Sequence, residues 1–274
     1  MSAEPRARTS RGRGHGEDAL RALLPIAMLA IGALIWDQVV RWFELPPVVL
    51  PGPGLVFRTI VSDWQDLSDA LLVTLTTTLE GFVLALVGGI ALAILFNLSR
   101  LVEYSFYPFA IILQVTPVVA IAPLLLIYLP QQGAVLVCAW IVAFFPVLAN
   151  TTLGLNSVDR NLVDLFRLYG ASGWQVLIRL KLPAASPYIL GGLKIVGGLS
   201  LIGAVVAEIA AGAAGRGAGL AFLISESGYR LRIPRMFAAL VLLSAAGIVI
   251  YFALALLSHL LLRRWHESAI ARDA

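Results

Sequence analysis

The sequence has 274 residues, of which 59% are hydrophobic and 13% are charged, and its formal net charge is +4. Soluble domains carry about a quarter charged residues, so this composition excludes a single water-soluble globule and indicates an integral membrane protein. The one cysteine, Cys138, excludes a disulfide framework within the chain and a cysteine-based metal cluster.

The first 21 residues contain five arginines among glycine, serine and alanine. This composition predicts a disordered basic cytoplasmic tail over residues 1–21, which orients the first membrane span. Aromatic residues do not alternate with the arginines, so a nucleic-acid-binding arm is not expected. The apolar stretch that follows is long and lacks a small-residue cleavage site, so we do not expect a cleavable signal peptide.

Six segments are long and apolar enough to cross a bilayer, which takes about 20 residues each. They are expected at residues 22–40, 70–98, 105–128, 134–153, 185–211 and 236–262. Four prolines between the first two segments predict an extended outer segment, followed by a short surface helix around residues 63–69. The sequence therefore predicts an all-α, six-span domain over residues 22–262 and a cytoplasmic tail over residues 263–274.

Lysine and arginine concentrate in the loops on one side of these six spans. With both termini in the cytoplasm, the inner segments carry Arg6, Arg8, Arg11, Arg13, Arg21, Arg100, Arg160, Arg167, Arg179, Lys181, Arg263, Arg264 and Arg272, and the outer segments carry Arg41, Arg58, Arg216, Arg230, Arg232 and Arg235. Basic residues favour the cytoplasmic side. We therefore expect the amino and carboxyl termini, and the loop at residues 155–183, to be cytoplasmic.

That loop is the longest polar island in the second half of the chain. Its apolar residues recur at helical spacing on both sides of Gly170: Leu162, Leu165, Phe166 and Tyr169 before it, and Trp174, Leu177, Ile178 and Leu182 after it. The spacing predicts two short amphipathic helices joined at Gly170 and ended by Pro183. Their apolar faces either lie flat on lipid headgroups or dock a cytoplasmic partner protein.

Asp164-Leu165-Phe166, Gly170, Leu180 and Leu182-Pro183 resemble the EAA loop of ABC-importer permeases, with Leu165 and Phe166 in place of two alanines. The runs at residues 115–130, 144–159 and 191–209 resemble the nitrate/sulfonate/taurine permease group, which also includes permeases for thiamine-related pyrimidine precursors. The resemblance implies the type I ABC-importer permease fold in a bacterial inner membrane. It also implies a second permease copy, a pair of ATPase subunits that bind ATP and Mg, and a periplasmic or lipid-anchored solute-binding protein.

The same resemblance implies that the loop couples the spans to the ATPase. The residues expected to do so are Asp164, Phe166, Arg167, Tyr169, Gly170, Ala171, Ser172, Trp174, Leu180, Leu182 and Pro183. This chain is expected to bind no cofactor itself, because Gly191-Gly192-Leu193-Lys194 lacks the spacing and the Ser/Thr of a phosphate-binding loop. Three scattered histidines and the absence of paired carboxylates predict neither a catalytic nor a metal site.

Polar residues inside the spans are candidates for a solute pathway. Gln114 and Thr116 precede Pro117 in the third span, and Asn150 lies in the fourth. Prolines break membrane helices where these line a cavity, although the two polar side chains could equally join helices by hydrogen bonds. Glu80 and Glu208 are further candidates, because charges within membranes usually face a cavity. Glu208 could instead contact interfacial water.

Two other classes of protein remain open from the sequence. An ATP-independent channel or secondary transporter would often show an internal repeat and ion-coupling charges, and a membrane scaffold would use the loop to bind some other protein. Copurification with an ATPase separates both from an importer. The solute, whether a sulfonate, taurine, nitrate or a pyrimidine precursor, is not determined, and neither is a homodimeric or heterodimeric permease pair.

Overall fold

The computed structural model describes residues 15–212 and 218–262, with side chains from residue 23 onward, and these ranges are helical without any strand. The helices are α1 (His15–Trp42), α2 (Pro53–Ser62), α3 (Trp64–Leu98), α4 (Arg100–Val115), α5 (Val118–Tyr128), α6 (Gln131–Asn156), α7 (Arg160–Leu168), α8 (Gly173–Val176), the π-helical turn η1 (Leu177–Lys181), α9 (Leu182–Ala211), α10 (Leu220–Tyr229) and α11 (Ile233–Leu262). Five helical segments are long and apolar enough to cross a membrane, and the bent pair α4–α5 makes a sixth. The predicted all-α, six-span architecture is therefore confirmed.

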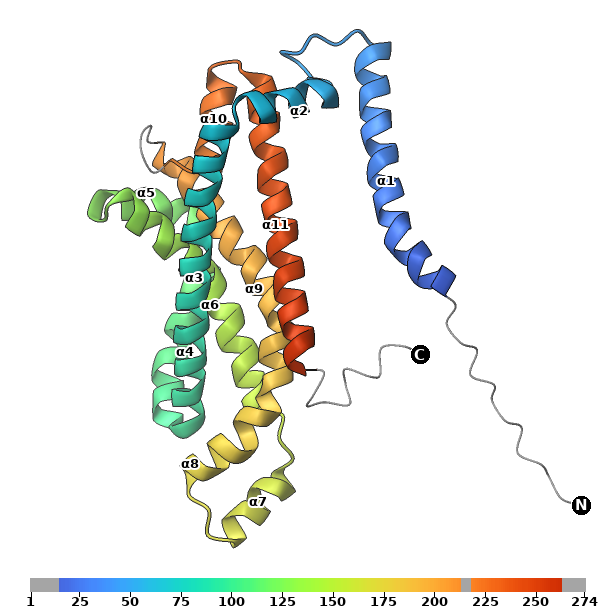
Figure 1. Ribbon diagram of the computed structural model, residues 1–274. Coiled ribbons are helices and arrows are strands. Elements are labelled where there is room, and N and C mark those ends of the chain that lie inside the picture. Colours follow the sequence, from blue (N-terminus) through green and yellow to red (C-terminus); the bar gives the residue numbers. More distant parts are fainter. Residues whose placement is uncertain (1–14, 213–217, 263–274) are drawn as a thin grey trace, which may run out of the picture.

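Helices α3, α6 and α9 form the centre of the bundle, α11 packs on α9, and α1 stands to one side (Figure 1). The start of α1 and the end of α11 lie at the same end of the molecule as α7 and α8 (Figure 1). We call this the inner end, because the distribution of basic residues predicts that it faces the cytoplasm. The opposite end, which carries α2 and α10, is called the outer end.

Small residues bring the central helices into close contact. A Cβ atom on Gly203 of α9 would lie 2.7 Å from the carbonyl oxygen of Cys138 in α6, and one on Gly154 of α6 would lie 2.9 Å from the Cα of Ala185. Such approaches are typical of membrane helix interfaces. Gly203 therefore allows α9 to pack closely on α6, whereas Gly191 and Gly198 have no neighbour within 4 Å.

The first third of the chain differs from the prediction in two places. Helix α1 begins at His15, so residues 15–21, expected to be part of a disordered tail, are helical, and residues 1–14 lie outside the described ranges. The short outer helix is α2 at Pro53–Ser62, and residues 64–69 already belong to α3. The prediction of a surface helix at 63–69 was wrong because Pro53 occupies the first turn of α2, where a proline needs no hydrogen-bond donor.

The third predicted span consists of two helices. Helix α4 ends at Val115 and α5 starts at Val118, with an angle of 101° between them. Thr116 follows the end of α4 and Pro117 precedes the start of α5, and both are in extended conformation. The residue before a proline is pushed out of the helical region, which accounts for the break. Figure 1 shows α5 turning away from the long axis of the bundle.

The second helix of the polar island was predicted to end at Pro183, and this prediction was wrong. Instead α8 continues through η1 into α9, so residues 173–211 form one helical rod. Within the π turn, the N–H of Leu182 donates to the carbonyl of Leu177, five residues earlier. The wider turn replaces the regular ladder just where Pro183 supplies no N–H group, and the rod passes the proline without a break.

Candidate functional site

At the inner end, α7 and α8 form a small helical hairpin, which we call the helix pair (residues 160–176). The Asp159 carboxylate caps α7 by accepting a hydrogen bond from the N–H of Asn161 at 2.9 Å. Gly170 ends α7 at φ +75°, and its N–H donates to the carbonyl of Arg167 at 2.9 Å. Ser172 and Gln175 then form a capping box that starts α8. Local signals therefore fix the turn without support from the bundle.

The helix pair presents most of its apolar side chains to solvent, and Val176 at the end of α8 is the buried exception. Helix α7 has no buried residue, and the exposed fractions are 84% for Leu168, 85% for Tyr169 and 56% for Trp174. A hollow of about 530 Å³ opens between the two helices, lined by Leu165, Phe166, Tyr169, Gly170, Ala171, Gln175 and Arg179. An exposed apolar patch with a hollow at its centre is typical of a protein-docking surface.

The predicted coupling residues separate into two groups in the structure. Asp164, Phe166, Arg167, Tyr169, Gly170, Ala171, Ser172 and Trp174 lie together on the helix pair, where Asp164 and Arg167 form an exposed ion pair at 3.6 Å. Leu180 lies on η1, and Leu182 and Pro183 begin α9. Leu182 packs against the central core cluster. The first group makes up the exposed helix pair, and the second joins it to a membrane span.

A second hollow lies at the break between α4 and α5. It has a volume of about 340 Å³ and is bounded by Gln114, Thr116 and Pro117 on one side and by α6 and Leu199 of α9 on the other. The hydroxyl of Thr116 donates to the carbonyl of Ile112 at 2.6 Å, whereas the Gln114 side chain is exposed. The structure therefore brings three of the predicted pathway residues to one hollow between spans.

Asn150 does not line that hollow. Its amide donates to the carbonyl of Pro146 at 2.9 Å, one turn earlier in α6. A Cβ atom on Gly192 of α9 would lie 2.9 Å from the Asn150 amide nitrogen. Asn150 thus packs against Gly192 where α6 and α9 meet.

Glu208 lies at the outer end, buried among α3, α9 and α10 with an exposed fraction of 2%. Its carboxylate accepts hydrogen bonds from the Thr74 hydroxyl at 2.9 Å and from the N–H of Ala221 at 3.0 Å. The Thr74 oxygen in turn accepts the N–H of Leu220 at 2.9 Å. A carboxylate at a helix start is favourable because it satisfies free N–H groups. Glu208 therefore anchors α10 and does not line either hollow.

Glu80 lies on the exposed face of α3, in line with the exposed residues Thr76, Val83 and Val87. The buried face of the same helix carries Gly81, which packs on Ala139 of α6. Glu80 therefore points away from the hollow between the spans. A charge on a membrane-facing surface is costly unless it is hydrated or paired.

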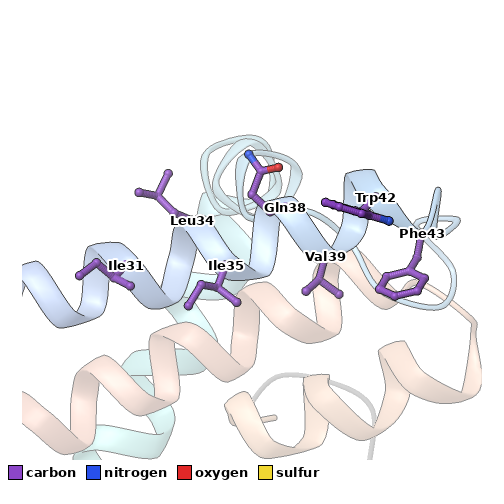
Figure 2. A pocket seen from close by; sticks show the side chains of 7 residues that line it. All are labelled: Ile31, Leu34, Ile35, Gln38, Val39, Trp42 and Phe43. Carbon is purple, nitrogen blue, oxygen red and sulfur yellow. The ribbon is translucent and has the colours of Figure 1, made fainter.

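Figure 2 shows the outer half of α1, where seven side chains border a shallow hollow of about 290 Å³. Six of them are apolar, namely Ile31, Leu34, Ile35, Val39, Trp42 and Phe43, and Gln38 is the exception. All seven come from α1 and the residue after it, so no second element closes the hollow. This surface suits contact with lipid or with another apolar helix better than it suits a polar solute.

Several structurally important residues were not predicted from the sequence. Thr74 hydrogen-bonds Glu208, and the run of threonines near the start of α3 is the sequence feature that could have indicated it. Lys181 donates to the side-chain oxygen of Asn97 at 2.8 Å, and the Asn97 amide donates to Asn156 at 3.2 Å. These three residues are far apart in the sequence, and only the folded bundle shows that they meet.

Comparison with known proteins agrees with this arrangement. Residues 85–267 match the family described as binding-protein-dependent transport system inner membrane component. The riboflavin transport system permease protein of Chloroflexus aurantiacus is 33% identical over 89% of this chain and 90% of its own length. A probable ABC transporter permease protein of Haemophilus influenzae is 30% identical over 88% and 97% of the two chains. A crystal structure of an amino acid ABC transporter with histidines shares the fold, with a TM-score of 0.61, 20% identity and coverage of 76% of this chain and 98% of that chain.

Proposed function

The chain belongs to the family of binding-protein-dependent transport system inner membrane components. We therefore propose that it moves a small solute by coupling its spans to a separate ATPase. It is a multi-pass permease subunit of the ABC-importer class. In this proposal two ATPase subunits bind ATP and Mg at the inner end. A solute-binding protein delivers the solute at the outer end, and both termini lie in the cytoplasm of a bacterial cell.

The observation that carries the proposal is the exposed apolar helix pair. Leu168 and Tyr169 are more than four-fifths exposed beyond the membrane spans, and α7 packs on nothing in the described chain that would bury a residue. A short helix with an apolar face gains most of its stability from packing. A rigid partner with a complementary groove would supply that packing, and an ATPase subunit fits this position at the inner end.

The hollow at the α4–α5 break supports the solute pathway. We propose that Gln114 and Thr116 contact the solute there, because they are the polar side chains on a hollow that is otherwise apolar. No charged residue borders it, which favours a neutral polar solute over a bare anion. Relatives named for riboflavin and formylaminopyrimidine transport, at 33% and 32% identity, support a nitrogen heterocycle as the solute class.

A second permease copy is supported by the outward face of α3. Glu80 lies on that face in line with Thr76, Val83 and Val87, and a charged side chain facing hydrocarbon costs several kcal/mol unless it is hydrated or paired. A second copy packed there would enclose Glu80 in a polar seam or a water-filled path between the two permeases. In that arrangement Glu80 borders the shared pathway.

The proposal predicts that an ATPase subunit copurifies with the solubilised chain from its native membranes. Exchanging Leu168 and Tyr169 together for glutamate should abolish recovery of the ATPase, because docking would then bury two unpaired charges. The measurement is the amount of ATPase subunit, and of vanadate-sensitive ATP hydrolysis, recovered per permease. The matched control is Tyr229→Glu, which alters an equally exposed tyrosine (90%) at the outer end and should leave recovery unchanged.

Absence of the ATPase from the native preparation would contradict the importer proposal and favour a channel or a scaffold. Equal recovery with the Leu168 and Tyr169 variant would show that an ATPase binds, but not at the helix pair. The two results can be told apart because native protein and variant are measured side by side.

The pathway assignment makes a separate prediction. Cysteine at position 114 should react with a charged, water-soluble thiol reagent on the order of tenfold faster than cysteine at position 249, because the thiolate forms only where water reaches. Val249 of α11 is 65% exposed on the outer surface of the bundle and serves as the lipid-facing control. The natural Cys138 is buried and should not contribute. Equal rates at 114 and 249 would contradict a hydrated pathway at the break.

A further inference from the structure

The rod formed by residues 173–211 touches the rest of the bundle at its inner end in two different ways. Leu177 is 1% exposed and packs in the same core cluster as Leu155 of α6. One turn further along, Lys181 makes the polar contact, with its ammonium 2.8 Å from the side-chain oxygen of Asn97. Close packing holds the rod against α6, whereas the hydrogen bond is directional and reaches a different helix, α3. The polar contact therefore adds a specific link between the rod and α3.

The contact extends to a third helix. Asn97 lies in the last turn of α3 and also donates to Asn156 at the end of α6 (3.2 Å). The three side chains line a polar hollow of about 70 Å³, and Arg100 and Glu103 line it as well. Arg100 and Glu103 form their own ion pair at 3.1 Å, and Lys181 bonds to the Asn97 side chain instead. Lys181, Asn97 and Asn156, which we call the inner latch, connect the ends of α3, α6 and the rod.

Building on the proposed ATPase docking, we propose that Lys181 is a positioning residue for energy coupling: through the inner latch it makes α3 and α6 move together with the rod when the ATPase displaces the helix pair. The latch lies at the π turn, where the helix ladder is widened and therefore more easily bent. Without a fixed contact at this point, displacement of α8 would be absorbed by bending of η1. With the latch in place, the displacement is passed to the central spans.

The test uses the purified complex of the permease and its ATPase subunits in lipid nanodiscs. Spin labels are placed at two exposed positions, Asn161 on α7 and Gln65 at the outer end of α3, and the distance between them is measured with and without Mg-ATP and vanadate. Lys181→Met, which keeps the stem but removes the donor, should lose at least half of the nucleotide-dependent change in distance. Asn97→Leu should show the same loss, and the two changes combined should add nothing further.

Lys194→Met is the matched control. Lys194 lies on the same rod but contacts the ring of Tyr251 at 5.9 Å, so its replacement should leave the change in distance as in the native complex. ATPase recovery must remain at the native level in all variants, which separates loss of transmission from loss of docking. If Lys181→Met with bound ATPase shows the full native change, the inference is wrong. If native protein recovers no ATPase, it is the proposed function that fails.

Discussion

Replacing Gly170 with proline is expected to abolish ATPase recovery and ATP-dependent transport, while the chain still inserts into the membrane at native levels. Gly170 has φ +75°, whereas the proline ring fixes φ near −65°. The change also removes the N–H that donates to the carbonyl of Arg167 at 2.9 Å. Forcing φ to a negative value and removing this hydrogen bond together cost about 3 kcal/mol or more. Helix α7 has no buried residue whose packing could offset that cost.

Gly170→Asn is the control that isolates backbone conformation from side-chain bulk. Asparagine tolerates positive φ far better than other non-glycine residues, and a Cβ atom at this position has no neighbour within 4 Å. We therefore expect the asparagine variant to bind the ATPase nearly as well as native protein. Recovery is compared by pull-down, and insertion by the yield of folded protein in detergent. Native recovery with Gly170→Pro would show that the turn does not define the docking surface.

The sequence predicted those parts of the fold and of the sites that depend on local pattern. Apolar runs of the right length identified the six spans, because a bilayer fixes the length of a spanning helix. Helical spacing interrupted at Gly170 identified the helix pair. The turn between the two helices needs a residue with positive φ, and glycine adopts that conformation readily. Pro117 likewise marked the break beside Gln114 and Thr116.

What depends on contacts between distant segments could not be predicted. Pro183 was expected to end a helix, yet the π turn at residues 177–181 carries the helix past it. The Lys181–Asn97 contact joins residues 84 positions apart, and nothing in either local sequence specifies the other. Glu208 was a candidate for the pathway because a charge in a span usually faces water. Its neighbours Thr74 and Ala221 instead provide the hydrogen bonds that solvent would have supplied.

Glu208→Leu is accordingly expected to lower the free energy of unfolding by about 2–6 kcal/mol, since two buried donors lose their acceptor and each such loss costs about 1–3 kcal/mol. The two donors are the Thr74 hydroxyl and the N–H of Ala221. The loss should be concentrated at the outer end, where Leu220, Phe222 and Leu223 of α10 pack with α2, α3 and α11. Thermal unfolding in detergent measures the total effect, and hydrogen exchange of the first α10 amides measures its location. Glu208→Gln retains one acceptor and should show an intermediate effect.

The matched control is Glu226→Gln on α10 itself. The Glu226 carboxylate pairs with Arg230 at 2.9 Å, and the arginine is 58% exposed, so removing the charge should change stability by less than about 1 kcal/mol. Fast exchange at Leu220 and Ala221 in the Glu208→Leu variant, with native exchange in Glu226→Gln, would establish Glu208 as the anchor of α10. Native stability and exchange with leucine at position 208 would contradict it. In that event α10 would be held by its apolar contacts alone, and the buried carboxylate would again be a candidate for the solute pathway.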